Sequence, residues 1–268
     1  MKKQPIGIFD SGIGGLTVFK EIRQKFPYED IIYFGDTARV PYGPKSPQTV
    51  LNYSIQNARF LLQNGAKIIV IACNTSSSVA LEKLKKILPI PVIGVIQPGA
   101  AQAISVTKIK RIGIIGTEGT IRSHSYRRAI QEISPEMKVL NKACPLLVSL
   151  VEEGWENHKI SELIIREYLT SLLQENIDTL VLGCTHYPIL KNVIRKIVGN
   201  KIKLVDSAEA VAKKLQDILP NAETETIGSN KFYVSDNEEK FRQIATRILN
   251  KEIEHLLRVT LGESWFVE

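Results

Sequence analysis

Residues 67–78 read Lys67-Ile68-Ile69-Val70-Ile71-Ala72-Cys73-Asn74-Thr75-Ser76-Ser77-Ser78. The apolar, mostly β-branched run before the cysteine is typical of a fully buried strand. The polar run after it supplies helix N-cap residues, and a helical pattern of apolar side chains follows. The segment therefore predicts a strand that ends at Cys73 and a helix that begins directly after it. The free N–H groups at such a helix start are expected to favour thiolate over thiol.

The same construction recurs at Thr179-Leu180-Val181-Leu182-Gly183-Cys184-Thr185-His186, where an apolar run again ends at a cysteine. Cys73 and Cys184 are 111 residues apart, which is the length of a whole α/β domain. Strands alternate with helical patterns along the chain, and this alternation predicts mainly parallel sheets. We therefore expect an α/β fold with two similar lobes, each of which contributes one cysteine.

The expected lobes place the two cysteines around one ligand. Ligands bind at the carboxyl ends of the strands in such sheets, so facing lobes would put the two thiols on opposite sides of a shared cleft. Gln97-Pro98-Gly99 interrupts the pattern of strands and helices and marks the first boundary between lobes. The strand ending at Asp206 closes the second unit.

Composition excludes several classes of protein. The 268 residues carry a net charge of +7, but the lysines are scattered over helical segments, which disfavours nucleic-acid binding. No apolar run approaches the ~20 residues that span a bilayer, and no signal peptide is evident, so we expect a cytoplasmic protein. Three cysteines without zinc-ligand spacing predict neither a disulfide framework nor a metal site.

Two alike acid–base groups on opposite faces of one atom are what stereoinversion at carbon requires. One group removes a proton and the other delivers a proton to the opposite face, and the reverse reaction exchanges the roles. A thiol, with a reference pKa of about 8.5, suits both roles near neutral pH. The alternative is that Cys73 and Cys184 are two buried thiols that merely end strands, since free cysteine is often a small core residue.

Charged residues near the predicted strand ends are candidates for tuning the thiols. Asp10 ends the first strand and precedes the glycine-rich turn 11–15, where its carboxylate disfavours binding of a dinucleotide pyrophosphate. Asp10 beside one thiol and His186 beside the other would hold the thiols in different states; alternatively, Asp10 only caps a helix. Glu152 and Glu153 end an apolar helix against its dipole, which indicates either a role in the site or an exposed helix end.

Two further residues allow more than one interpretation. Tyr42 lies in a loop with three prolines, where it either contacts a ligand or anchors the loop. Cys144 also ends a predicted strand, but Pro145 and an apolar segment follow it, so we interpret it as a structural residue.

Together these motifs resemble the bacterial glutamate racemases over nearly the whole chain. The segments that carry the resemblance are 6–18, Pro41-Tyr42-Gly43, Ala72-Cys73-Asn74-Thr75, Cys144-Pro145-Leu146, Val151-Glu152-Glu153-Gly154, 182–188 and 232–236. The resemblance implies a cofactor-independent isomerase that interconverts L- and D-glutamate and supplies D-glutamate to peptidoglycan. It also implies two flavodoxin-like lobes with the active site in the cleft between them, formed by residues 1–97 completed by 207–268 and by residues 98–206.

The same resemblance implies roles for individual residues. Cys73 and Cys184 would be the acid–base pair, assisted by Asp10, Glu152 and His186. The substrate-binding residues would be Asp10, Ser11, Tyr42, Gly43, Asn74, Thr75, Thr120, Thr185 and His186. Glutamate would be the small-molecule partner of a homodimer that needs no metal and binds neither nucleic acid nor membrane.

Other functions stay open at this point. The nearest alternative is an aspartate racemase of the same superfamily, because side-chain length is a property of the pocket. A non-catalytic two-lobe protein that binds anionic amino acids and a thiol redox sensor are further alternatives. The first predicted strand begins soon after residue 1, without the longer N-terminal extension of members that a cell-wall precursor nucleotide activates, so we expect no such activation.

Overall fold

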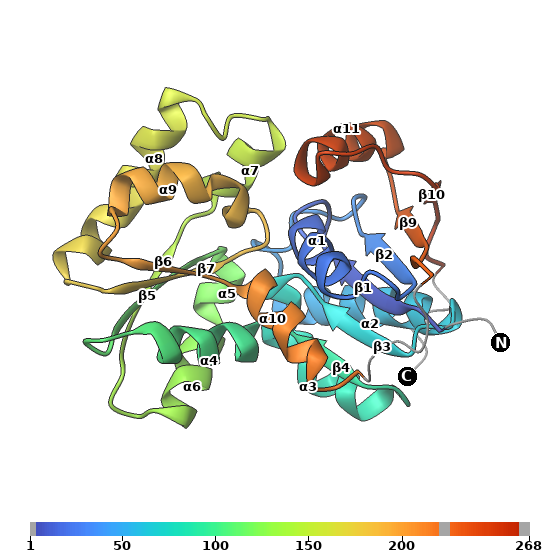
Figure 1. Cartoon of the computed structure of the whole chain (residues 1–268), viewed down its shortest axis with the longest axis horizontal. Helices are drawn as coiled ribbons and strands as arrows, with labels where there is room; N and C mark the ends of the chain where they lie inside the picture. The colour runs from blue at the N-terminus through green and yellow to red at the C-terminus, as the bar shows by residue number, and fades with distance from the viewer. Residues whose placement is uncertain (1–3, 220–225, 263–268) are drawn as a thin grey trace.

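The computed structural model describes residues 4–219 and 226–262, which form two α/β lobes side by side (Figure 1). In this part of the chain, the first lobe contains a six-stranded sheet of order β10-β9-β2-β1-β3-β4. All its strand pairs are parallel. Its strands are β1 (Ile6–Asp10), β2 (Ile31–Gly35), β3 (Ile68–Ile71), β4 (Val92–Gly94), β9 (Asn230–Val234) and β10 (Leu256–Arg258).

The second lobe contains a four-stranded parallel sheet of order β6-β5-β7-β8. Its strands are β5 (Arg111–Gly116), β6 (Lys138–Ala143), β7 (Thr179–Gly183) and β8 (Lys203–Asp206). The order β2-β1-β3-β4 of the first sheet repeats here with β6, β5, β7 and β8 in the same places. The two lobes are therefore similar, as the spacing of the cysteines predicts, and β3 and β7 occupy equivalent positions.

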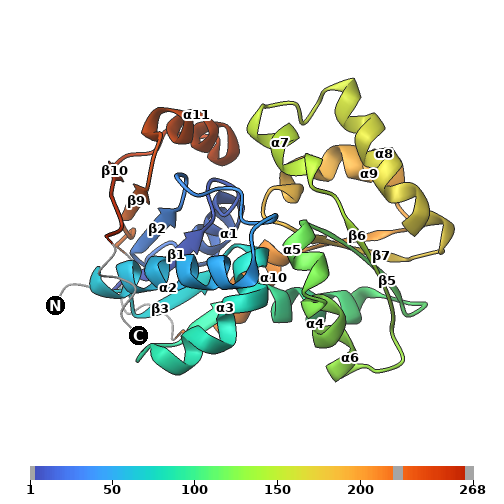
Figure 2. The ribbon, with the colours of Figure 1, turned by 180° about the vertical axis from the view of Figure 1, so that it is seen from behind.

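Helices cover both faces of the first sheet. The face that carries Ile6 and Ile8 packs against α1 (Leu16–Lys25), α10 (Ser207–Gln216) and α11 (Glu238–Leu249). The opposite face, which carries Phe9 and Ile32, packs against α2 (Pro47–Gln63) and α3 (Asn74–Ile87). Figure 2 shows α2 and α3 in front of this face. Burial on both faces explains why these strands read as continuous apolar runs.

The second sheet is also covered on both faces. One face packs against α4 (Ile96–Val106) and α6 (Ser125–Ile133). The other packs against α7 (Leu146–Glu152), α8 (Lys159–Gln174), the 3-10 helix η1 (Tyr187–Leu190) and α9 (Lys191–Val198). The short helix α5 (Glu118–Arg122) follows β5. Within the described residues, no helix is long and apolar enough to cross a membrane.

The prediction that residues 97–99 lie outside any helix or strand is wrong. Gln97-Pro98-Gly99, expected to interrupt the pattern, lies inside the first turn of α4. Proline is tolerated there because the first N–H groups of a helix have no intrahelical partner.

Candidate active site

The carboxyl ends of β3 and β7 bring Cys73 and Cys184 to the walls of one small cavity between the lobes. Both cysteines are 5% exposed, and all three cysteines of the chain are free thiols. The residues that line the cavity are Ser11, Val40, Pro41, Tyr42, Gly43, Cys73, Asn74, Thr75, Thr117, Val148, Cys184, Thr185 and His186. The structure thus unites the two cysteine motifs that lie far apart in the sequence.

Helix α3 begins directly after Cys73, as the sequence predicts, but its N-cap is Cys73 itself and not a residue of the polar run. The Cys73 Sγ accepts a hydrogen bond from the Ser76 N–H at 3.5 Å. The expectation that this position favours the thiolate is wrong in this structure. Burial, with a smaller contribution from the nearby Asp10 carboxylate, raises the pKa of the Cys73 thiol to about 11, although the Ser76 N–H acts in the opposite direction. Cys73 is therefore a thiol at neutral pH.

Cys184 has a different environment. No α-helix begins directly after it; instead, Thr185 and His186 lead into the 3-10 helix η1. The Cys184 Sγ lies 3.8 Å from His186 Nδ1, and His186 Nε2 lies 3.2 Å from Oε1 of Glu152. The Cys184, His186 and Glu152 side chains thus form a hydrogen-bonded row that runs from the cavity to the end of α7.

The charges in this row stabilise one another. Burial alone would lower the pKa of His186, but its hydrogen bonds to Cys184 and Glu152 raise it to about 10. Burial likewise opposes ionisation of Glu152, yet the hydrogen bond to His186 lowers its pKa below the usual value. The protonated His186 ring therefore lies between the Cys184 sulfur and the Glu152 carboxylate.

Asp10 lies behind the cavity wall and is fully buried. Its carboxylate accepts a hydrogen bond from the Gly12 N–H at 3.0 Å and one from the Thr185 hydroxyl at 3.4 Å. Burial raises the pKa of Asp10, while the charge of His186 and these donors lower it. Asp10 therefore interacts electrostatically with both halves of the site, through Cys73 in one lobe and His186 in the other.

Most of the predicted substrate-binding residues line the cavity. Ser11, Tyr42, Gly43, Asn74, Thr75, Thr185 and His186 do so, whereas Asp10 and Thr120 stand behind the lining. Thr120 Oγ1 lies 3.0 Å from Thr117 Oγ1 and 3.4 Å from Thr75 Oγ1. Tyr42 is also a loop anchor, because its hydroxyl donates to the Asp36 carboxylate and accepts from Asn57 Nδ2 at 3.1 Å.

Four lining residues were not among the predicted site residues: Val40, Pro41, Thr117 and Val148. Thr117 follows β5 and is the N-cap of α5, where its side chain accepts from the Thr120 N–H. Ligands bind at the carboxyl ends of strands in parallel sheets, and this rule would also have identified Thr117. Val40 and Val148 are apolar residues without a distinguishing sequence pattern.

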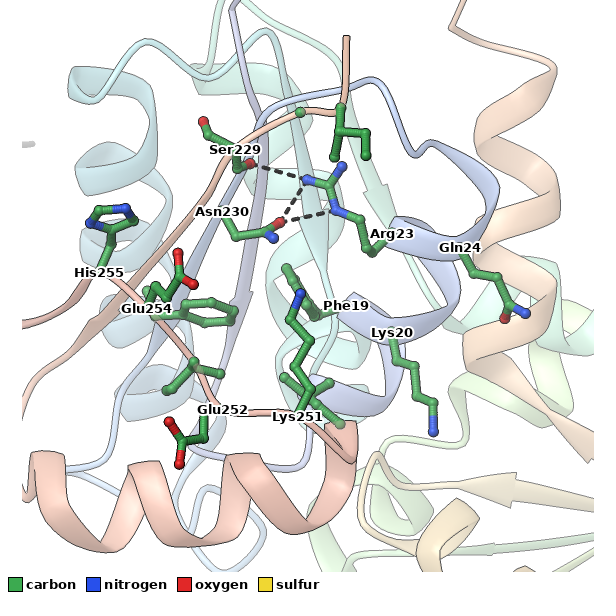
Figure 3. Close-up of a pocket in the computed structure, with 15 residues that line it drawn as sticks. Phe19, Lys20, Arg23, Gln24, Ser229, Asn230, Lys251, Glu252, Glu254 and His255 are labelled. Carbon is green, nitrogen blue, oxygen red and sulfur yellow. Dashed lines mark hydrogen bonds between the residues drawn. The ribbon is translucent and has the colours of Figure 1, made fainter. Parts of the chain in front are cut away.

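A different pocket, of about 510 Å³, lies in the first lobe between α1, the start of β9 and the segment before β10 (Figure 3). Its Arg23 guanidinium donates to Asn230 Oδ1 and to the carbonyls of Pro27 and Ser229. Because these hydrogen bonds engage Arg23 within the protein, its guanidinium is not free to bind a ligand. Neither Cys73 nor Cys184 lines this pocket.

Among residues 4–219 and 226–262, no three His, Cys, Asp or Glu side chains form a group that could hold a metal ion.

Comparisons with known proteins show which family the chain belongs to. The profile of the Asp/Glu/hydantoin racemase family matches residues 13–215. The glutamate racemase of Geobacter metallireducens is 51% identical over 265 residues, covering 97% of this chain and 98% of that protein. The glutamate racemase of Sulfurihydrogenibium sp. is 50% identical, covering 91% of this chain and 94% of that protein.

Solved structures show the same fold. The glutamate racemase isoform RacE1 from Bacillus anthracis matches with a TM-score of 0.94 at 41% identity, over 97% of this chain and 99% of that one. The glutamate racemase from Francisella tularensis, solved in complex with D-glutamate, matches with a TM-score of 0.91 at 41% identity, over 98% of this chain and 100% of that one.

Proposed function

Because the chain belongs to the Asp/Glu/hydantoin racemase family, we propose that it interconverts L-glutamate and D-glutamate by proton transfer at Cα between Cys73 and Cys184. The observation that carries this proposal is that two thiols, one from each lobe, line the same cavity. The identity of about half the residues with glutamate racemases over nearly full length supports glutamate as the substrate.

The two thiol environments suggest how a cycle begins. Cys184, beside the protonated His186, is set to act as thiolate base, and Cys73, whose pKa is raised by burial and Asp10, holds the proton to be delivered. After the transfer, Cys73 is the thiolate and Cys184 the thiol, which is the state the opposite direction requires. Asp10, His186 and Glu152 act through the thiols, and no group outside the chain is needed for the proton balance.

The substrate is held by groups at the strand ends. The N–H groups and side chains at the start of α3, with Asn74 and Thr75, suit a carboxylate. Ser11 of the same lobe and Thr185 of the other lobe offer hydroxyls. Tyr42, Gly43 and Thr120 complete or support this lining. The Francisella protein was solved with D-glutamate, and we infer the same ligand here, with aspartate as the alternative.

Replacement of each cysteine tests the assignment. Cys73→Ala and Cys184→Ala should each lower turnover of both glutamate enantiomers at least about 100-fold, because each removes one of the two proton carriers. Cys144→Ala is the matched control, since Cys144 is buried but does not line the cavity. Circular dichroism would verify folding of all three variants. Near-wild-type turnover by either of the first two would contradict the two-thiol assignment.

The proposal extends to the organisation of the protein. We infer that residues 1–97 and 207–268 form one lobe and residues 98–206 the other, because the described strands of each sheet fall within these ranges. D-glutamate made in the cytoplasm would supply peptidoglycan synthesis, and with it cell-wall biogenesis and cell shape.

We also expect the protein to be a homodimer, which analytical ultracentrifugation would test. A single monomeric species at micromolar concentration would exclude a stable dimer.

A further inference from the structure

The Asn74 side chain leaves one hydrogen-bonding group unused on the cavity wall. Asn74 is 2% exposed and begins α3 directly after Cys73. Its Oδ1 accepts a hydrogen bond of 2.8 Å from the Tyr126 hydroxyl, but its buried Nδ2 has no partner among the described residues. A buried donor without an acceptor is costly, so such a group in a binding cavity points to a ligand that completes it.

Tyr126 reaches Asn74 from the other lobe. It lies on α6, is 2% exposed, and its ring occupies space that two glycines leave open. A Cβ at Gly183 would lie 3.1 Å from the ring, and a Cβ at Gly99 would lie 3.3 Å from the ring and the hydroxyl. The ring is therefore held in place by packing, and its hydroxyl has a fixed position relative to Asn74.

The Tyr126 hydroxyl donates its single proton to Asn74 Oδ1. Burial raises the pKa of Tyr126, so the phenol stays protonated, and the Ser207 side chain hydrogen-bonds to the same oxygen. With Ser207 donating to the phenol oxygen, the single phenol proton goes to Asn74 Oδ1. The amide is thereby oriented with its NH₂ group, rather than its carbonyl, toward the cavity.

We propose that Tyr126 is a positioning residue that orients the Asn74 amide, so that Nδ2 donates a hydrogen bond to a carboxylate oxygen of bound glutamate. This inference rests on the function proposed above. An amide that rotated freely would present its carbonyl oxygen to the carboxylate part of the time, and that arrangement is repulsive. The hydrogen bond also joins the two lobes, because Asn74 follows β3 of the first sheet and α6 packs on the second.

The variant Tyr126→Phe removes the hydroxyl and keeps the ring that fills the space beside Gly99 and Gly183. We expect KM for both enantiomers to rise about three- to tenfold, with kcat changed less than about twofold, because the lost contact holds ground state and transition state alike. Tyr233→Phe is the matched control: its ring packs on Phe60, away from the cavity. An unchanged KM in Tyr126→Phe would overturn the proposal.

A double-mutant cycle separates positioning from a general structural role. Asn74→Ala should raise KM, and adding Tyr126→Phe to it should change KM no further, because Tyr126 acts through Asn74. Equal effects of Tyr126→Phe in both backgrounds would contradict the proposal.

Calorimetric titration with D-glutamate compares binding by wild type and Tyr126→Phe without relying on a rate measurement. We expect Tyr126→Phe to weaken the Kd about three- to tenfold, whether or not Asn74→Ala folds. Wild-type protein that binds D-glutamate without racemising it would refute the proposed function alone. Equal Kd values for wild type and Tyr126→Phe would refute the positioning role alone.

Discussion

At the scale of single residues, the two thiols differ although their positions in the two sheets are equivalent. Cys73 has a helix start and a buried carboxylate near it, and burial with Asp10 raises its pKa to about 11. Cys184 has His186 at 3.8 Å and, behind it, Glu152. The sequence identifies both cysteines, Asp10 and His186, because strand ends are readable. Burial depends on which side chains close over a group, so the sequence left open which thiol is charged, and the helix start alone does not decide it for Cys73.

The raised pKa of His186 makes a prediction about stability and pH. His186 has a pKa of about 10 in the folded state against its ordinary value of 6.5, so its protonation stabilises the folded state fully below pH 6.5. This contribution is lost as the pH rises from 6.5 through 10. The free energy of unfolding of wild type should therefore exceed that of His186→Asn by more at pH 6 than at pH 10, as measured by urea denaturation.

His124→Asn is the matched control for this experiment. His124 has a φ of 53°, a conformation that asparagine tolerates, and it does not line the cavity. Its stability difference from wild type should not follow the same trend with pH. A difference between wild type and His186→Asn that stays constant from pH 6 to pH 10 would mean that His186 is not stabilised as a cation.

At the scale of elements, the glycine-rich turn after β1 serves close packing between the lobes. A Cβ at Gly14 would overlap His186 Nδ1 and Thr185 Oγ1, which belong to the second lobe. The Thr17 hydroxyl donates to the carbonyl of Thr185 at 3.0 Å beside this contact. The sequence disfavours a dinucleotide site at this turn, but the partner of the glycines is visible only in three dimensions.

Substitution in this turn should damage the site more than the fold. Gly14→Ala should lower kcat/KM about tenfold or more. The added methyl would displace the His186 ring by a fraction of an ångström, which changes its position relative to the Cys184 sulfur. The free energy of unfolding should fall by about 1–3 kcal/mol, as is usual for overpacking. Steady-state kinetics and urea denaturation measure the two effects.

Gly12→Ala is the control in the same turn. Its Cβ would contact only the Val40 side chain, at 3.3 Å, instead of overlapping His186 and Thr185, and its N–H would still donate to Asp10. We expect a loss of kcat/KM below about threefold. Equal losses in the two variants would show that the turn tolerates no added methyl anywhere, and the specific contact of Gly14 with His186 would not be the cause.

Most elements could be predicted from the sequence because both faces of each sheet are covered, which produces long apolar runs. The 3-10 helix η1, the short strand β10 and helix α4 were not predicted. Each depends on local context: Pro188 lies within η1, β10 has only three residues, and Pro98 occupies a helix turn where proline is allowed. Short elements and helix starts carry little periodicity, so their assignment needs the tertiary structure.

At the scale of the whole molecule, the two lobes are closed on each other. The Gly119 N–H donates to the Gly43 carbonyl at 2.9 Å, and Thr75 Oγ1 lies 2.8 Å from Thr117 Oγ1 across the cavity mouth. The cavity has a volume of about 20 Å³, which is room for little more than one water molecule. The sequence predicted two similar lobes and a shared cleft, but not how closely they approach, because that depends on contacts between many residues. Glutamate can enter only after the lobes separate.

Closure makes a prediction about access to the thiols. An alkylating reagent should modify Cys73 and Cys184 much more slowly than a free thiol, at a rate set by opening of the lobes. Saturating D-glutamate should slow modification of these two residues further, while Cys144, which does not line the cavity, should be unaffected. Mass spectrometry of peptides would follow each cysteine. Modification of Cys73 at the rate of a free thiol, with no effect of D-glutamate, would contradict the closed cavity.

We propose that the protein as a whole transfers protons at Cα of glutamate through Cys73 and Cys184. The most direct test is NMR of L-glutamate in heavy water with purified protein and no added cofactor, alongside optical rotation. We predict that D-glutamate appears with deuterium at Cα while the remaining L-glutamate is still unlabelled at early times, because the proton is removed by one thiol and a deuteron delivered by the other. L-aspartate treated in the same way should stay unchanged. Loss of the Cα–H signal from L-aspartate alone would replace the substrate, and no exchange with either amino acid would contradict the claim.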